Sequence, residues 1–443
     1  MAGEWETSRL GDCVTHQKGF AFKSADYRPS GHPIIRVSNF TDRSIDIAEC
    51  SYLDHGAVQQ HEAYKLRHRD AVIATVGSWP TNPASVVGKT ICVPEKAEAA
   101  LLNQNAVRLR GKPNLDQRFL FYLLKQPDFQ TYIVGTAQGS ASQASITLND
   151  IFGFEFQRPS LAEQKAIAAV LGALDDKIEL NRRMNATLEA MARALFQSWF
   201  VDFDPVRAKL DGRLPAKLDA ITAALFPAKF QDSPLGPIPL GWTADTIKNR
   251  ASNIQYGFTQ SATKEQIGPH FLRITDISGG KVDWASVPFC QATNEEREKY
   301  RILDGDICIA RTGASTGDNI YVVEPPPAVF ASYLIRIQFS SRGVGRLVGE
   351  FTRTQDYASH VASMIGGSAQ PNASAQALAA ASMVFPPEEI ADAFYRTVRP
   401  FDLMRAANDR ESRTLATLRD TLLPKLLSGE LSTARTQIRS THD

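Results

Sequence analysis

The sequence predicts an α+β protein: two tandem, mixed, strand-rich domains separated by two long antiparallel helices that form a coiled-coil spacer, with internal pseudo-two-fold symmetry. First, the chain repeats itself, because Gly19-Phe20 in one half returns as Gly257-Phe258 in the other. Second, the apolar segment 70–77 returns as 306–313 in the same order. Third, a long apolar stripe follows each copy. A repeat this long is a duplicated domain and not a solenoid unit.

Composition agrees with a globular protein of several domains. The chain has 443 residues, with 43% hydrophobic and 22% charged side chains, in the ordinary range for globular proteins. No apolar run approaches the roughly 18 residues needed to cross a bilayer, and the N-terminus lacks a signal-peptide pattern. The cysteines are odd in number and never form a C-x-x-C pair, so we expect reduced thiols and a cytoplasmic protein: Cys13, Cys50, Cys92, Cys290 and Cys308.

The first copy, residues 1–155, opens with short apolar segments between Gly, Pro, Asn and Asp, a pattern typical of strands and turns. The expected strands are 34–37, 71–74, 85–88, 90–93 and 106–109. Residues 118–124 are the expected helix. The Gly/Ser/Ala/Gln stretch 138–145 predicts a surface loop without regular structure.

The first long helix is expected within residues 156–205, where apolar residues recur three or four apart, and the stripe includes Met191. Ser160 and Glu163 form a capping-box pattern at its start. About 40 helical residues would span about 60 Å. Residues 206–238 are rich in Pro and Ala and predict a linker.

The second copy, residues 239–385, repeats the order of the first. Its expected strands are 271–274, 306–309 and 333–337, its helix is 345–351, and its Gly/Ser/Ala/Gln loop is 366–374.

The second long helix is expected over residues 386–430, and the tail 431–443 should be disordered. Shifted to a common register, the two helices align their apolar residues, and Asn181 and Asn185 align with Asn408 and Ser412. A polar interruption of this kind fixes register and partner. The stripe of the second helix includes Leu418, and the expected helix–helix seam consists of Leu171, Leu174, Ile178, Leu188, Leu195, Trp199, Phe401, Leu415, Leu422 and Leu426.

No catalytic or metal-binding pattern is complete. Gly88-Lys89-Thr90 resembles the end of a P-loop, but Pro83 stands where the upstream Gly is required. His61-Glu62 lacks the second His of a zincin site, and residues 82–84 lack the full tetrapeptide of amino-methyltransferases. Asp175-Asp176-Lys177 is interpreted as solvated helix charge. We therefore expect no catalytic residue, no metal and no chemistry by this chain alone.

Recognition chemistry remains. Two copies of one domain suit a partner with two-fold symmetry, such as duplex DNA, but a net charge of +1 provides little affinity for phosphates. Such a DNA reader must concentrate its cations on one face or gain affinity from a partner. The candidates combine cations, aromatics and side chains that read base edges: Lys18, Phe20, Lys23, Arg36, Ser38, Asn39, Ser140, Ser142, Gln143, Tyr256, Arg273, Thr275, Asp276, Arg311, Gln370 and Asn372.

Each candidate group also has a simpler interpretation. Arg36 and Arg273 could pair with a nearby carboxylate, the two Gly/Ser loops could bind nothing, and Phe20 and Phe258 could belong to the core.

Four segments resemble the specificity subunit of type I restriction-modification systems: residues 159–165, 174–183, 196–205 and 422–431. The resemblance extends over essentially the whole chain. The start of the second helix departs from the family pattern, because residues 386–390 replace a fuller Pro-x-x-Glu-Gln start.

The resemblance implies that each copy is a target recognition domain that reads one half of a split DNA target, while the helices set the gap between the halves. It also implies docking of two modification subunits and, through them, of restriction/translocase subunits. S-adenosylmethionine, ATP and magnesium would belong to those partners, with no cofactor in this chain. The alternatives are a scaffold or inhibitor that binds proteins through the duplicated domains, and an enzyme with an unrecognised site.

Overall fold

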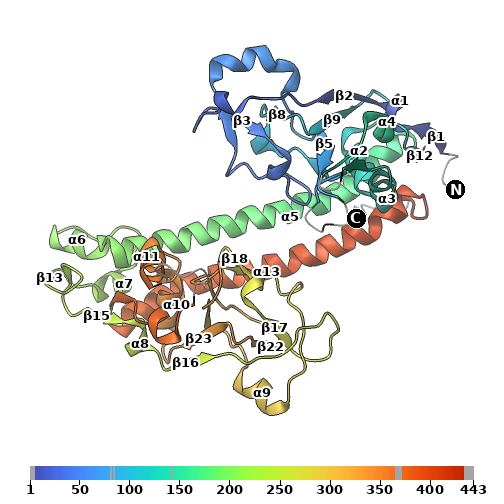
Figure 1. Ribbon diagram of the computed structural model, residues 1–443. Coiled ribbons are helices and arrows are strands. Elements are labelled where there is room, and N and C mark those ends of the chain that lie inside the picture. Colours follow the sequence, from blue (N-terminus) through green and yellow to red (C-terminus); the bar gives the residue numbers. More distant parts are fainter. Residues whose placement is uncertain (1–4, 80–81, 83–84, 141–142, 365–371, 434–443) are drawn as a thin grey trace, which may run out of the picture. The chain divides into compact units, whose positions relative to one another are not determined.

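The computed structural model describes residues 5–79, 82, 85–140, 143–364 and 372–433. The chain divides into two compact units (Figure 1). Unit 1 comprises Met1–Glu179 and Ser412–Asp443, and unit 2 comprises Leu180–Glu411. Both units mix helices and strands, as the α+β prediction requires.

Unit 1 is built on an antiparallel sheet of four strands. Their order across the sheet is β2 (Val14–Lys18), β9 (Ala106–Gly111), β5 (Ala71–Ala74) and β7 (Thr90–Cys92). Beside it lie β4 (Ser51–Leu53), β3 (His32–Ile35) and β8 (Leu101–Leu102), with β3 and β8 parallel. The pair β1 (Glu6–Arg9) and β12 (Glu155–Arg158) joins the two ends of the copy.

The helices of unit 1 are short apart from the long-helix segments. They are α1 (Leu10–Cys13), α2 (Gln117–Lys125), α3 (Pro127–Gly135) and α4 (Leu148–Phe152), with 3-10 turns at Ser24–Asp26, Val37–Asn39, His55–Tyr64 and Glu95–Ala97. The helix expected at 118–124 is therefore confirmed as α2. Asp116 caps it by accepting the backbone N–H groups of Arg118 and Phe119.

Unit 2 repeats this sheet order with β16 (Asn253–Tyr256), β23 (Leu334–Gln338), β20 (Ile307–Ala310) and β21 (Asn319–Tyr321). A parallel pair, β17 (His270–Leu272) and β22 (Ala328–Phe330), again lies beside the sheet. The pair β15 (Thr243–Thr246) and β24 (Ser382–Phe385) corresponds to β1 and β12. The remaining strands are β13 (Phe230–Gln231), β14 (Ile238–Pro239), β18 (Ile277–Ser278) and β19 (Lys281–Val282).

The helices of unit 2 follow a similar order, and α10 covers one face of the four-stranded sheet (Figure 1). They are α6 (Asp204–Leu210), α7 (Ala220–Leu225), α8 (Ile247–Arg250), α9 (Asn294–Lys299), α10 (Arg342–Phe351), α11 (Gln355–Met364) and α12 (Ala375–Leu378). A 3-10 turn spans Ile274–Asp276. The duplication seen in the sequence is thus a duplication of topology.

The central strand of each sheet is buried on both faces. In β5, Ala71 and Ile73 pack in one hydrophobic cluster, and Val72 and Ala74 pack in another. In β20, Ile307 and Ile309 separate from Cys308 and Ala310 in the same way. Because side chains alternate across a strand, a wholly apolar segment of this kind needs cover on both sides.

A glycine is required at the same place in both units, directly after the edge strand. A Cβ on Gly19 would lie 1.9 Å from the backbone oxygen of Asn103, and a Cβ on Gly257 would lie 2.3 Å from that of Ala331. Both contacts are with backbone, which cannot turn aside as a side chain can. The repeated Gly-Phe pair therefore marks a close approach of two chain segments.

The long helices are α5 (Leu161–Phe196), which continues into a π-helical turn at Gln197–Val201, and α13 (Glu388–Leu427). Ser160 accepts the backbone N–H of Glu163, as the capping box predicts. Gly429, with φ +76°, follows the end of α13. Residues 156–158, which precede the cap at Ser160, belong to β12 and pair with β1.

Within unit 1, α5 and α13 share an apolar cluster. Its members from the two helices are Ile167, Ala168, Leu171, Leu423, Leu426 and Leu427, with Leu422 partly buried against them. Of the other expected seam residues in this unit, Leu174, Ile178 and Leu415 are half-buried. Leu418 is 45% exposed, so the apolar stripe does not extend to it.

Within unit 2, the segments of α5 and α13 run antiparallel, joined by buried amides. The Nδ2 group of Asn408 donates to Asn185 at 2.8 Å, and that of Asn185 donates to Asp409 at 2.7 Å. Asn181 donates to Glu411 at 2.8 Å. Within this unit, the polar interruption seen in the sequence is thus a hydrogen-bonded contact between helices.

The apolar end of this helix pair is aromatic. The rings of Phe196, Trp199 and Phe200 lie 6.4, 6.0 and 5.1 Å from that of Phe394. Leu195 and Phe401 are partly buried against the same core, and Leu188 is half-buried. Met191 is 45% exposed and lies outside the seam.

Three sequence-based expectations for the secondary structure are wrong. Residues 85–88 form a turn in which Gly88 has φ +75°, not a strand. Residues 138–140 and 143–145 are strands β10 and β11, which pair with β6 (Val76–Gly77), so the expected loop is a hairpin. The expected linker carries α6, α7, β13 and β14, and its Phe226 and Ile238 are buried in the core of unit 2. Residues 366–371 of the second loop and the tail from residue 434 lie outside the described residues.

Candidate nucleic-acid interface

Lys18 and Tyr256 occupy equivalent places at the edge of the two sheets. Lys18 ends β2 opposite Val107, and Tyr256 ends β16 opposite Ile335. Both side chains are exposed. Two strands further into each sheet, β5 and β20 also end at equivalent positions. The backbone N–H of Thr75, directly after β5, donates to Asn105, and that of Arg311, directly after β20, donates to Tyr333. Unit 2 thus presents Tyr256 and the half-buried Arg311 at this end of its sheet, whereas unit 1 presents Lys18 and buries Thr75.

In unit 2, this edge brings together Tyr256, Arg311 and Asn372. The guanidinium carbon of Arg311 lies 5.1 Å from the centroid of the Tyr256 ring. Thr312 pairs with Asn372 in an isolated β-bridge. The exposed Asn372 is therefore close to Arg311, the residue before Thr312. Gln370, the other candidate in the loop 366–374, lies outside the described residues.

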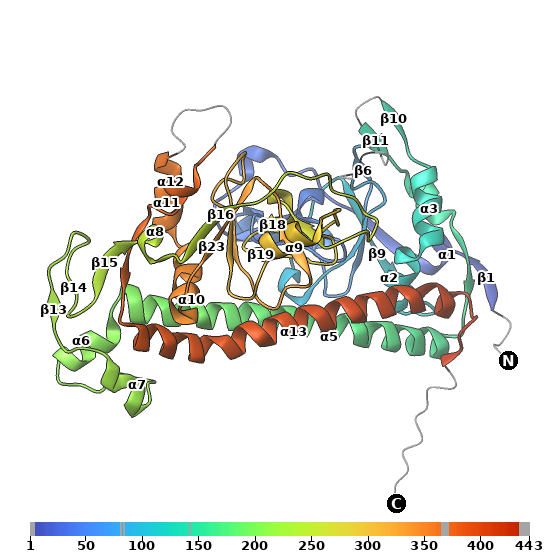
Figure 2. The same ribbon diagram turned by 90° about the horizontal axis from the view of Figure 1, so that it is seen from below.

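In unit 1, the corresponding edge is the β10–β11 hairpin, which carries the exposed Ser140 and Gln143 (Figure 2). The indole Nε1 of Trp79 donates to the backbone oxygen of Ser140 at 2.6 Å. Ser142 lies outside the described residues. The sequence analysis missed Trp79, although a lone Trp within a Ser/Pro/Asn-rich stretch is a signal that could have found it.

Arg36 and Arg273 follow equivalent strands, but their neighbours differ. Arg273 places both arms of its guanidinium on Asp276, at 3.0 and 2.8 Å, and this hydrogen bond raises the pKa of Arg273. This is the carboxylate pairing considered above, so Asp276 is engaged within the chain. Thr275 is exposed next to the pair.

In the part of the chain that the structure describes, the unit 1 counterpart, Arg36, has no such ion pair. Asn39 is 6% exposed, accepts the backbone N–H of Arg36 at 2.9 Å and donates to Glu49. The structure therefore gives Asn39 a structural role and does not present it to a ligand. Arg36 is half-buried, and Ser38 is exposed.

The aromatic candidates differ in exposure. Phe20 is half-buried and packs against Phe22, His61 and Tyr64, with ring centroids 4.6 to 5.1 Å from its own. Phe258, its counterpart, is 8% exposed and belongs to the core of unit 2. Lys23, near Phe20, is exposed.

A second exposed aromatic lies at the unit 2 edge. The backbone oxygen of Tyr333 accepts the N–H of Arg311, and Tyr333 is 56% exposed. The sequence analysis treated Tyr333 only as the start of a strand, and nothing in the repeat distinguished it.

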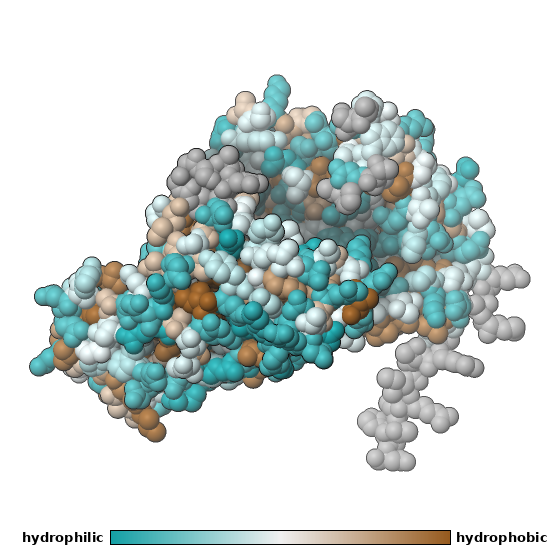
Figure 3. All heavy atoms as spheres, turned by 60° about the horizontal axis from the view of Figure 1, so that its bottom comes forward, coloured by the Kyte–Doolittle hydropathy of each residue, from teal (hydrophilic) through white to brown (hydrophobic). Residues whose placement is uncertain are grey.

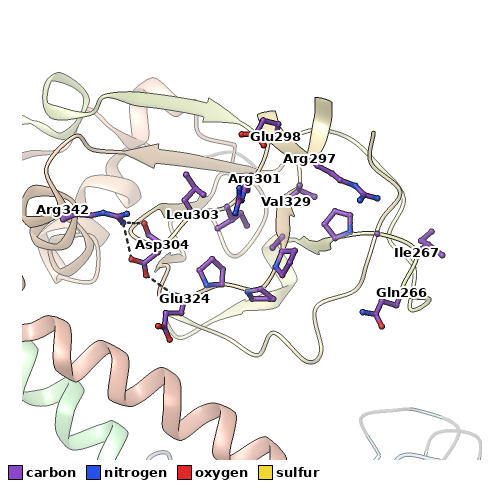
Figure 4. A pocket seen from close by; sticks show the side chains of 17 residues that line it. Gln266, Ile267, Arg297, Glu298, Arg301, Leu303, Asp304, Glu324, Val329 and Arg342 are labelled. Atoms are coloured by element: carbon purple, nitrogen blue, oxygen red, sulfur yellow. Dashed lines mark hydrogen bonds and ion pairs between the residues drawn. The ribbon is translucent and has the colours of Figure 1, made fainter. Parts of the chain in front are cut away.

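A groove of about 960 Å³ lies elsewhere in unit 2 (Figure 4). Arg342 donates to Asp304 on one wall, while Arg297 and Arg301 belong to another. Residues 325–327, three prolines, line it as well. No candidate interface residue lines this groove, which therefore is a separate feature.

The face shown in Figure 3 is largely hydrophilic, with small scattered hydrophobic spots. No helix among the described residues has an apolar stretch long enough for a bilayer crossing.

The architecture defines the class of the protein: two copies of one mixed α+β fold, each with polar side chains and an aromatic side chain near the same end of its sheet. Residues 2–190 match the family model of the type I restriction modification DNA specificity domain. The chain is similar to type I restriction-modification specificity subunits, as the sequence segments implied.

Two relatives illustrate the similarity. The HindI specificity subunit of Haemophilus influenzae is 27% identical over 71% of this chain and 77% of its own length. The MjaIX specificity subunit of Methanocaldococcus jannaschii is 22% identical over 74% and 72%, respectively. The structure of a type I system S subunit from M. genitalium has the same fold, with a TM-score of 0.58, 16% identity and 96% coverage of both chains. The scaffold or inhibitor alternative receives no support from these comparisons.

Proposed function

We propose that this chain is the DNA-reading subunit of its complex, with each unit reading one half of a bipartite target. Type I specificity subunits assemble with other subunits and bind DNA. The observation that carries the proposal is that the two units share one strand order but differ at equivalent edge positions, Lys18 and Thr75 against Tyr256 and Arg311. A common scaffold with different edge side chains suits two readers of different half-sites.

The long helices are proposed as the spacer between the half-sites and as the docking surface for two methyltransferase subunits. The hydrogen-bonded Asn185 and Asn408 support this, because buried polar contacts fix the register of paired helices. A fixed register gives a fixed separation. The restriction/translocase subunits would join through the methyltransferase subunits. S-adenosylmethionine, ATP and magnesium would be bound by the partners.

Partner subunits would also explain the low net charge. With a net charge of +1, this chain alone has few excess cations for phosphate contacts. We expect the isolated chain to bind duplex DNA weakly and the assembled complex to bind it tightly and selectively.

Exchange of residues 1–155 for those of a relative with another target tests the independent reading. Modification-site sequencing of a host carrying the hybrid and its modification partner should show one half-site changed and the other retained. A change in both halves would refute independent reading. The reciprocal exchange of residues 239–385 is the matched control and should change only the other half.

Insertion of about four residues near the middle of α5 tests the spacer. Four residues add about one helical turn, roughly 6 Å of length, so the gap between the half-sites should change while their sequences stay the same. The same sequencing measures the gap. An unchanged gap with normal modification would show that the helix does not set it.

A further inference from the structure

An arginine stacked on a tyrosine lies at the sheet edge of unit 2. Arg311 directly follows β20, and its guanidinium carbon lies 5.1 Å from the centre of the Tyr256 ring. The Tyr256 hydroxyl accepts the backbone N–H of Ala375 at 2.8 Å. Tyr256 is therefore held by β16 at its backbone and by the start of α12 at its hydroxyl. A ring fixed in this way restricts the guanidinium plane that lies over it.

No described residue provides a carboxylate partner for this guanidinium. Among the described residues no ion pair involves Arg311, and its Nε atom is buried without a hydrogen-bond partner. Arg273 in the same unit uses its guanidinium on Asp276, and Arg336 lies 3.7 Å from Asp306. Arg311 is thus an oriented donor pair whose acceptor is not supplied by the described part of the chain.

The surroundings favour a base over a phosphate. Asn372 forms a β-bridge with Thr312, the residue after Arg311. The backbone oxygen of Tyr333 accepts the N–H of Arg311, and both Asn372 and Tyr333 are exposed. An amide can hydrogen-bond to a base edge and an aromatic ring can stack on a base face, so these neighbours suit a base. Of the four bases, only guanine offers two acceptors, N7 and O6, to a planar donor fork in the major groove.

We propose that Arg311, supported by Tyr256, is a specificity-determining residue that reads one guanine in the half-site bound by unit 2. This inference rests on the proposed function. Unit 1 has Lys18 and Thr75 at the equivalent positions, and Thr75 is 4% exposed. A lysine is a point charge and lacks the planar fork, so the same contact cannot be made in the other half-site.

The test uses the chain assembled with its modification partner. Modification-site sequencing first gives the target, and competition binding then compares duplexes with each base pair of the target replaced in turn. For the native complex, replacement of one G·C pair in the unit 2 half-site should cost about tenfold or more in affinity. Arg311→Ala should remove that preference at this one position and leave the other positions unchanged.

Two further variants test whether the planar guanidinium, and not its positive charge or a general effect on folding, provides the preference for guanine. Arg311→Lys keeps the charge, and it should lose the guanine preference while retaining most of the affinity. Arg250→Ala is the matched control, because Arg250 is also stacked on a ring, that of Phe385 at 5.2 Å, but is paired with Asp245 at 2.8 Å. It should keep the guanine preference.

The outcomes are distinguishable. If Arg311→Ala weakens binding equally to all duplexes, the residue contacts a phosphate and the inference is overturned. A preference retained in both Arg311 variants also overturns it, while the proposed function stands. If the native assembled complex shows no dependence on sequence in either half-site, the proposed function itself fails, and the inference fails with it.

Discussion

In each unit, an aspartate on a long helix accepts hydrogen bonds from a shorter helix, but the two aspartates are buried to different degrees. In unit 1, Asp175 of α5 accepts the Tyr122 hydroxyl at 2.6 Å and Arg419 at 2.5 Å, and the Asp175 side chain is 22% exposed. In unit 2, Asp402 of α13 accepts both arms of Arg346 at 2.7 and 3.1 Å and is 3% exposed. The duplicated position keeps its aspartate, while its partner changes from a tyrosine to an arginine.

The difference shows which features a duplication retains. The apolar alternation of β5 and β20 is kept, because both faces of each strand are buried. The polar partners differ, because a hydroxyl or a guanidinium can each satisfy the same carboxylate. Burial of Tyr122, aided by the negative charge of Asp175, raises the pKa of its phenol, so it stays a neutral donor. Diversity between the units therefore lies in paired polar groups and at sheet edges.

The largest expected effect is that of Asp402→Ala. Within the described ranges, the change leaves Arg346 buried with Glu350, 2.7 Å away, as its remaining carboxylate partner. Breaking a buried ion pair costs about 3–5 kcal/mol. Urea unfolding should show this loss, and hydrogen exchange should place it in α10. Asp175→Ala should cost about 1–2 kcal/mol, because water can reach the vacated position.

Asp176→Ala is the control for this comparison. Asp176 lies next to Asp175 on α5 and pairs with Arg118 at 2.5 Å, but its side chain is 65% exposed. An exposed pair contributes at most about 1 kcal/mol. If Asp402→Ala and Asp176→Ala have equal effects on unfolding, the burial of these carboxylates does not determine their contribution to stability.

Much of the fold follows from local sequence. The strands β5 and β20, the capping of α5 by Ser160 and the end of α13 at Gly429 depend on residues close in the chain. The resemblance to the type I specificity subunits rests on four segments in and next to the long helices. These features are predictable because short-range propensity and the packed structure agree.

The remaining features depend on contacts that are distant in the sequence. The β10–β11 hairpin forms where a loop was expected, because β6 supplies a pairing strand and Trp79 holds Ser140. The linker residue Phe226 is buried because Trp199 and Trp242 provide an aromatic environment, with ring centroids at 5.3 and 6.3 Å. At the candidate interface, the sequence analysis named Asn39 and Arg311 alike as candidates for DNA contact. Only the three-dimensional contacts separate a buried capping amide from an arginine without a carboxylate partner.

A smaller loss of stability is expected when Glu189 of α5 is replaced. This carboxylate is surrounded by cations, whereas the corresponding cluster in unit 1 is built around an arginine. Glu189 lies 3.2 Å from Arg405, 3.3 Å from Arg193 and 3.6 Å from Lys281, and it also pairs with Arg353. Burial alone would raise the pKa of Glu189, but these cations outweigh it and lower the pKa below the usual 4.5. In unit 1, by contrast, Arg43 is shared among three aspartates, Asp42, Asp175 and Asp420.

Glu189→Gln should therefore destabilise unit 2 by about 1–3 kcal/mol at neutral pH, since charge-assisted hydrogen bonds are lost. A carboxylate with a lowered folded-state pKa stabilises fully above pH 4.5, and this contribution disappears as the pH falls through the folded-state value. The difference between native and variant unfolding free energies should thus shrink below pH 4.5. Urea unfolding between pH 3 and pH 7 measures it, with the exposed Glu265→Gln as the control. A difference that stays constant over this range would mean that Glu189 acts through packing and not through its charge.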